Sequence, residues 1–233
     1  MRSSRYISGI AAMLMAVGLL MAPLASAQEQ TAEAVLKKTT DQVLSVIEEA
    51  ADYVRDDPDR YYRRVNEVLD DVVDFRGFAR GVMGDYASSE RYRSLDEAGR
   101  ETLRKQLDRF TTAMREGLVR TYSKGLLAFG GSRVELDQER STGTDEGDPG
   151  RATLRQLIYS DASEPYVVIY QMAKNRDGQW LIRNLIVENV NLGQIYRSQF
   201  EAAARKFDGD LDKVIADWEV EPMEDDADSE TTA

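Results

Sequence analysis

The chain has 233 residues and contains neither cysteine nor histidine, which excludes disulfide bonds, thiolate zinc sites, imidazole metal ligands and Ser-His-Asp triads. Its 30 basic and 42 acidic residues give a formal net charge of -12, which disfavours binding to nucleic acid and to anionic membrane surfaces. Most familiar hydrolase mechanisms are therefore excluded, and packing alone must hold the fold together.

Residues 1–27 have the pattern of a secretory signal peptide. Two arginines precede an apolar run from Ile7 to Leu24, and Ala25, Ser26 and Ala27 form a small-residue cleavage site. A membrane anchor is the alternative, but an apolar run of about 18 residues that ends in small residues favours cleavage after Ala27. We therefore expect an exported chain, located in the periplasm if the bacterium has two membranes.

The chain from residue 28 to residue 131 is predicted to be mainly helical. Apolar residues recur at helical spacing between Thr31 and Val54, and Asp57-Pro58 supplies the cap and first-turn proline of a second helix. A short third helix follows in DFRGFARGVMG, residues 74–84, which has a complete apolar stripe between an aspartate and a glycine.

A long fourth helix is predicted to begin at a capping box formed by Ser94 and Glu97. Its apolar stripe runs from Leu103 to Tyr122, and Gly130-Gly131 ends it.

Residues 132–190 are predicted to form a sheet. Its four strands are expected at residues 133–140, 152–159, 166–173 and 179–190, with polar, turn-prone connectors that favour an antiparallel meander. Residues 191–218 form C-terminal helices, so that residues 28–218 make one domain. The segment 219–233 is acidic and poor in apolar residues, and we expect a disordered, solubilising tail.

The fourth predicted strand is apolar on both faces. Strict alternation places Trp180, Ile182, Asn184, Ile186, Glu188 and Val190 on one face and the residues between them on the other. Such a sheet needs helices on one face and another apolar layer on the other, which is either ordinary core or a ligand cavity. Periodicity alone favours ordinary core.

Four segments in order resemble the MlaC family, also called the toluene-tolerance or periplasmic phospholipid-binding family. They are DFRGFARGVMGDY, LVRTYSKGLLAF, YQMAKNRDGQWLIRNLIVENVNLGQIYRSQF and LDKVIADW. The resemblance extends from about residue 33 to residue 218. This chain departs from the family pattern at Asn184 and Asn189, where relatives often have aspartate and glycine, and in its acidic extension after Trp218.

The resemblance implies an α+β fold: a curved antiparallel or mixed sheet of about four strands, similar to that of nuclear transport factor, with a helical subdomain and an internal apolar pocket. It also implies a non-enzymatic carrier with bound glycerophospholipid as its cargo, and neither cofactor nor metal. The expected partners are an outer-membrane Mla lipoprotein complex and an inner-membrane ABC-type transporter with a ring-forming lipid-binding protein. Shuttling between them would maintain outer-membrane lipid asymmetry.

The apolar segments supply a candidate wall for acyl tails. This set consists of Phe75, Phe78, Val82, Met83, Tyr122, Leu126, Phe129, Val168, Tyr170, Ile182, Ile186, Val190, Tyr196 and Phe200. The candidate headgroup contacts are the cations Arg76, Arg80, Arg120, Lys124 and Arg197. For each residue alone, ordinary core or solvated surface is the competing interpretation.

Two other functions remain open from the sequence. The related curved-sheet fold also houses enzymes, and Glu188, Tyr170 and Tyr159 are the available acid-base candidates here. A non-lipid envelope adaptor that uses the same helical faces is the second alternative.

Overall fold

A computed structural model describes residues 30–141, 147–159 and 164–220. The predicted signal peptide and most of the predicted acidic tail lie outside the described residues. Within those ranges, no helix is both long and apolar enough to cross a membrane.

The helical half of the domain follows the predicted order. Its elements are α1 (Ala32–Ala50), α2 (Pro58–Asp70), α3 (Phe75–Met83), η1 (Gly84–Ala87), α4 (Ser89–Ser94), α5 (Glu97–Leu126) and η2 (Leu127–Phe129). The side chains of Asp57 and Asp74 cap α2 and α3 as predicted, and Thr31 caps α1. The long helix differs at its start, because Ser94 ends the additional helix α4 and Asp96 caps α5 by accepting a hydrogen bond from the Gly99 amide.

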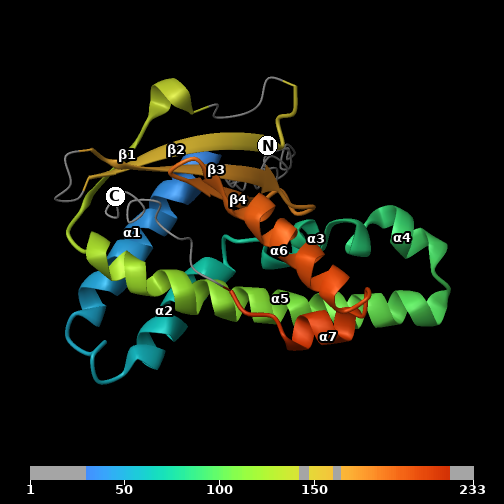
Figure 1. The fold of residues 1–233 in the computed structure, drawn as a ribbon. Coiled ribbons are helices and arrows are strands. Elements are labelled where there is room, and N and C mark those ends of the chain that lie inside the picture. Colours follow the sequence, from blue (N-terminus) through green and yellow to red (C-terminus); the bar gives the residue numbers. More distant parts are fainter. Residues whose placement is uncertain (1–29, 142–146, 160–163, 221–233) are drawn as a thin grey trace, which may run out of the picture.

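The sheet has five strands in the order β1-β2-β3-β4-β5, and every neighbouring pair is antiparallel (Figure 1). The strands are β1 (Arg133–Leu136), β2 (Arg151–Tyr159), β3 (Tyr166–Lys174), β4 (Trp180–Val187) and β5 (Val190–Asn191), with the short helix η3 (Gln138–Arg140) after β1. Helices α6 (Leu192–Lys206) and α7 (Leu211–Ala216) complete the chain. The predicted α+β class and antiparallel meander are confirmed.

A tight turn divides the predicted fourth strand into β4 and β5. Glu188 and Asn189 have φ angles of 47° and 69°, and Val187 pairs with Val190 across them. Two consecutive residues with positive φ form the type I′ turn that matches the twist of a hairpin, and asparagine tolerates this conformation better than most residues. Asn189 therefore allows the bend without a glycine.

A β-bulge in β4 overturns the expected alternation of its side chains. Met172 pairs with Ile182 and Gln171 pairs with Asn184, which leaves Arg183 without a partner across the strands. Cross-strand partners share a face, so Leu185 and Val187 lie on the face of Trp180 and Ile182. The prediction that Asn184 and Ile186 share this face is wrong, because one extra residue reverses the pattern after Ile182.

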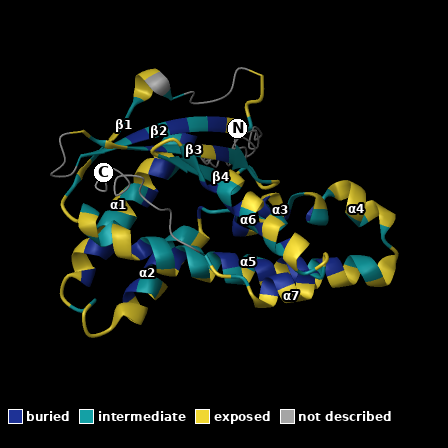
Figure 2. Ribbon diagram, in the orientation of Figure 1, coloured by how far each residue is buried: buried dark blue, intermediate teal, exposed yellow. Residues whose placement is uncertain are grey.

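The helices cover one face of the sheet, called here the inner face (Figure 1). Three apolar clusters hold the layers together. The helical core joins α3, α5, α6 and α7, the sheet core joins α1 to β2, β3 and β4, and the hairpin core joins α1, α2 and α5. Figure 2 shows the buried residues of these clusters along the facing sides of helices and sheet.

Candidate functional site

The inner face of the sheet is built from consecutive rows of cross-strand neighbours. One row packs against α1, and it contains Ala152, Met172 and Ile182, each no more than 4% exposed. A later row spans all five strands. This five-strand row consists of Leu136, Gln156, Val168, Val187 and Val190.

The five-strand row carries apolar side chains that the packed cores do not use. Val168, Val187 and Val190 belong to none of the three clusters, and the latter two are half-buried. The next row continues this surface with Ile158 and with Tyr166, whose exposed fraction of 42% marks it as an exposed large hydrophobic side chain. Half-buried aliphatic groups on a concave, helix-covered face are the kind of surface that binds apolar ligands.

Two contacts bound this surface. Gln156, which is 4% exposed, donates a 2.9 Å hydrogen bond to the Thr40 hydroxyl of α1, so the one amide in the row has a partner. The rings of Phe129 in η2 and Tyr166 in β3 meet edge-to-face at 5.3 Å. The row therefore faces α1 on one side and the end of the long helix on the other.

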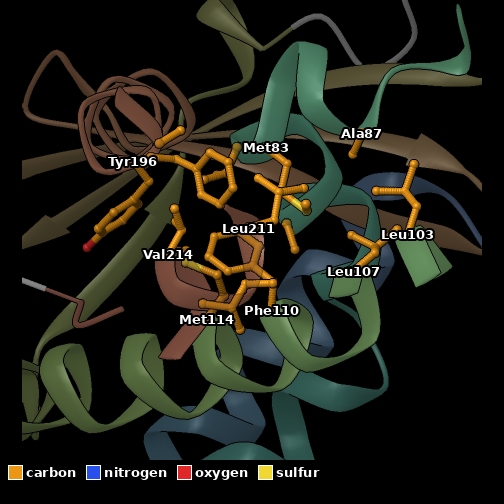
Figure 3. Packing of buried hydrophobic residues seen from close by; sticks show 14 of the residues in the cluster. Met83, Ala87, Leu103, Leu107, Phe110, Met114, Tyr196, Leu211 and Val214 are labelled. Atoms are coloured by element: carbon orange, nitrogen blue, oxygen red, sulfur yellow. The ribbon is translucent and has the colours of Figure 1, made fainter. Parts of the chain in front are cut away.

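A pair of tyrosine hydroxyls joins α5 to α6. The oxygens of Tyr122 and Tyr196 are 2.8 Å apart, and Tyr196 is 1% exposed. In Figure 3 the Tyr196 side chain lies at the margin of the helical core, with its hydroxyl turned away from the neighbouring carbon side chains. The hydroxyl pair fixes the spacing of the two helices.

The structure distributes the predicted tail-wall residues among different places. Phe78, Val82, Met83, Tyr122, Tyr196 and Phe200 belong to the helical core or pack against it, where Met83 and Phe200 have no exposed surface. Tyr170 and Ile182 belong to the sheet core, and Leu126 packs on the hairpin core. Phe75 is 8% exposed outside the clusters, and Ile186 lies on the outer face. Val168 and Val190 belong to the five-strand row, Tyr170 lies in the adjacent row of the same face, and Phe129 contacts Tyr166 at its border.

The predicted headgroup cations do not converge on that row either. Arg76 and Arg80 line a cleft beside α3 and α4, and Arg197 pairs with Glu201 and Asp85. Arg120 lies over the Tyr62 ring, 5.5 Å from its centroid. Lys124 is exposed in the last turn of α5, one turn before η2.

The three acid-base candidates lie in different places, two on opposite faces of the sheet and one in a turn. Tyr170 points to the inner face and burial raises its pKa well above the ordinary value, whereas Tyr159 pairs with Arg133 and points to the opposite face. Glu188 lies in the exposed turn, where its carboxylate accepts a hydrogen bond from the Val167 amide. The three groups therefore do not form a site, and no metal-ligand cluster is present in the described ranges.

Sequence reasoning missed part of the five-strand row. Strict alternation assigned Val187 to the other face, because the sequence pattern does not indicate the bulge at Arg183. Gln156 and Ile158 were not singled out, although their alternation in β2 places both on one face.

Comparison with known proteins agrees with this architecture. The sequence profile of the MlaC protein family matches residues 37–220. The toluene tolerance protein ttg2D of Pseudomonas putida is 27% identical over 196 residues, which cover 84% of this chain and 83% of that protein.

A solved structure shows the same fold. It is the phospholipid-binding protein from Ralstonia solanacearum in complex with a phospholipid, which matches with a TM-score of 0.65 and 18% identity over 80% of this chain and 94% of that chain. Because the family profile covers most of the sequence, this protein belongs to the MlaC family.

Proposed function

We propose that this protein is a periplasmic phospholipid carrier that holds acyl tails against the inner face of its sheet. The observation that carries the proposal is the five-strand row, whose valines face the helices without joining any of the packed cores. Membership of the MlaC family and the phospholipid bound to the Ralstonia solanacearum neighbour support it.

A carrier is needed because moving a phospholipid through water exposes its acyl chains. Each methylene removed from water is worth about 0.8 kcal/mol, so two acyl chains with roughly 30 methylenes represent about 20 kcal/mol or more. Free phospholipid therefore crosses an aqueous compartment very slowly. A protein that keeps the chains dry removes most of this barrier.

The walls of the proposed tail site follow from the contacts around the row. The sheet supplies Ile158, Val168, Val187 and Val190, and Phe129 with Tyr166 marks one border. The tightly packed residues of the helical core stabilise the fold and would not touch the tails.

Among the candidate headgroup cations, Lys124 is the best placed. It lies close in sequence to Phe129, and no acidic group lies within salt-bridge distance of it among the described residues. Lys124→Glu should therefore reduce the anionic share of bound phospholipid. An unchanged headgroup composition in lipid extracts would argue against this role.

Delivery is proposed to occur through protein partners, the outer-membrane and inner-membrane Mla complexes, because a net charge of -12 repels anionic bilayers. The proposed periplasmic location rests on the signal-peptide pattern of residues 1–27. Rapid exchange of lipid with bare anionic vesicles by the purified protein would contradict partner-dependent delivery.

Quantitative mass spectrometry of the protein purified from cells without detergent tests the carrier function directly. A carrier should contain phospholipid in a fixed ratio to protein, and its lipid should appear in extracts of the folded protein. A folded protein that is empty, and that does not take up phospholipid offered in vitro, would instead favour an envelope adaptor.

A further inference from the structure

A cleft of about 570 Å³ lies between α3, α4 and the first part of α5. Figure 1 shows that α4 and the start of α5 project beyond the sheet, so this end of the domain is accessible. None of the described lining residues belongs to the five-strand row or to the neighbouring row of Ile158 and Tyr166. The cleft is therefore separate from the proposed tail site.

The lining of this cleft, called here the arginine cleft, combines positive charge with an apolar floor. Its charged residues within the described ranges are Arg76, Arg80, Arg93, Arg104, Arg183 and Asp74. Ala87, Leu103 and Leu107 are at most 8% exposed and supply apolar surface, and Tyr92 adds an aromatic ring. Such a lining fits a ligand that has both negative charge and apolar groups.

Three of the five arginines are used by the fold itself. Salt bridges join Arg183 to Asp74, Arg76 to Asp108, and Arg104 to Glu97 and Glu101. Arg104 also donates a 3.1 Å hydrogen bond to the Tyr92 hydroxyl, which ties α5 to α4. These contacts hold the walls of the arginine cleft in place.

Arg80 and Arg93 differ from the other three arginines. Both residues are exposed, and neither has a carboxylate within 4.0 Å in the part of the chain that the structure describes. Arg93 donates one hydrogen bond, of 3.2 Å, to the Ser89 carbonyl. Because a guanidinium group has five N–H donors, both side chains retain donors for an anion.

The strength of exposed ion pairs indicates what kind of anion these two groups can hold. One exposed ion pair changes affinity by a factor of about five at most, so a small anion gains little here. A chain that carries several carboxylates combines such contacts, and its apolar side chains can cover the floor. An anionic bilayer is disfavoured, because the net charge of -12 repels it and a flat surface does not fill a cleft between helices.

We propose that the arginine cleft docks an acidic segment of a partner protein, whose carboxylates contact Arg80 and Arg93 and whose apolar side chains cover Leu103 and Leu107. This docking role rests on the proposed carrier function, because a carrier must meet partners to exchange its lipid. Since the arginine cleft is separate from the tail site, a partner can dock while lipid is bound. Salt should weaken the contacts, because the Debye length falls from about 10 Å at 0.1 M to about 3 Å at 1 M.

A short, fluorescein-labelled peptide of glutamate and leucine is the probe, and its fluorescence anisotropy with the full purified protein measures binding. The peptide should bind at low salt, and salt of about 1 M should weaken binding at least tenfold. The same peptide with glutamine in place of glutamate should not bind. Absence of binding by the acidic peptide, or equal binding by the glutamine peptide, would overturn the proposal.

Substitutions identify the groups responsible. Arg80→Gln with Arg93→Gln should weaken binding of the acidic peptide at least threefold. Circular dichroism should be unchanged, because neither side chain has an acidic partner within the described ranges. Arg55→Gln with Arg205→Gln is the matched control, since it removes two exposed arginines outside the arginine cleft and changes the net charge equally. An equal loss of binding in the control variant would show nonspecific attraction and would contradict the proposal.

Amide chemical shifts of the wild-type protein locate the peptide without any substitution. The peptide should shift the signals of α3, α4 and the first part of α5, and shifts that fall mainly on other elements would refute the assignment of the site. This measurement decides the matter even if the double variant does not fold.

Other probes separate the competing occupants. Inorganic phosphate that displaced the peptide as effectively as unlabelled peptide would show a small-anion site, and phosphatidylglycerol vesicles that bound the wild type but not the double variant would show a membrane site. Either result would overturn docking of a protein partner. Phospholipid extracted from the same wild-type preparation tests the carrier function separately. A lipid-loaded protein that does not bind the peptide refutes docking alone, and an empty protein that binds the peptide refutes the carrier function alone.

Discussion

A carboxylate placed on the inner face of the sheet should empty the protein of phospholipid, whereas the same group one residue earlier should not. Val187 belongs to the five-strand row, between Val168 and Val190. Ile186 pairs with Ile169 and points to the opposite face. Both side chains are half-buried, so Val187→Asp and Ile186→Asp perturb the fold to a similar degree and differ in the face that they charge.

The size of the effect follows from the ionisation of aspartate. An aspartate with an ordinary pKa of about 3.9 is charged at pH 7, and to lie against acyl chains it must be neutralised. Neutralisation over about three pH units costs about 4 kcal/mol, which lowers lipid affinity by about 10³. Access of water to part of the site reduces this value, so about 10³ is the upper limit.

The assay measures phospholipid per protein in extracts of each variant, with circular dichroism and thermal unfolding as checks of the fold. Val187→Asp should be folded and nearly lipid-free, and Ile186→Asp should be folded and loaded. If a folded Val187→Asp variant retained its lipid, or if Ile186→Asp lost as much, the assignment of the inner face as the tail site would be refuted.

Two further predictions concern stability. Gly77→Ala should lower the free energy of unfolding by roughly 1–3 kcal/mol, because a β-carbon would collide with the Asp74 carboxylate and approach the Arg183 guanidinium to 2.7 Å. Gly81→Ala on the same helix meets nothing within 4 Å and should stabilise by about 0.5–1 kcal/mol; equal denaturation midpoints for the two variants would contradict this reasoning. Burial raises the pKa of Tyr61 to about 12, so the unfolded chain loses its proton first and stability should fall between pH 10 and pH 12. In Tyr61→Phe the fall should be smaller, and thermal unfolding at several alkaline pH values would show an unchanged fall if the reasoning were wrong.

Local signals in the sequence were sufficient for most of the elements. The motif DFRGFARGVMG predicted α3 together with its cap, because Asp74 accepts a hydrogen bond from the Gly77 amide at 2.8 Å, as a helix cap requires. The predicted cap of α5, Ser94, was wrong by two residues, because Asp96 is the observed cap and both residue types are acceptable capping residues. Only the short helix α4 before it decides between them.

The candidate site was less predictable, because periodicity identifies a buried stripe without naming its partner. Phe200 was assigned to a tail wall, yet its ring packs on Phe110 and Trp218 with centroids 4.9 Å and 5.8 Å away. Those partners come from α5 and from the segment after α7, at sequence distances that no local pattern reports. Val190 was correctly placed on the face of Ile182, but the row that joins it to Val168 depends on the register of all five strands.

The bulge at Arg183 accounts for two features of the fold at once. Without the extra residue, strict alternation would turn Asn184 toward the helices and turn Val187 away, so a polar amide would replace apolar surface on the inner face. With the extra residue, the side-chain oxygen of Asn184 instead accepts a 3.0 Å hydrogen bond from the Gly193 amide.

The bulged residue itself ties α3 to the sheet. Arg183 pairs with Asp74, the cap of α3, and Val73 forms a parallel bridge with Ile182 immediately beside it. One additional residue in β4 therefore completes the apolar row and anchors the start of α3. Because the bulge sets the orientation of every later side chain in the strand, deleting Arg183 should disrupt both the proposed tail site and the start of α3 more than any substitution at that position.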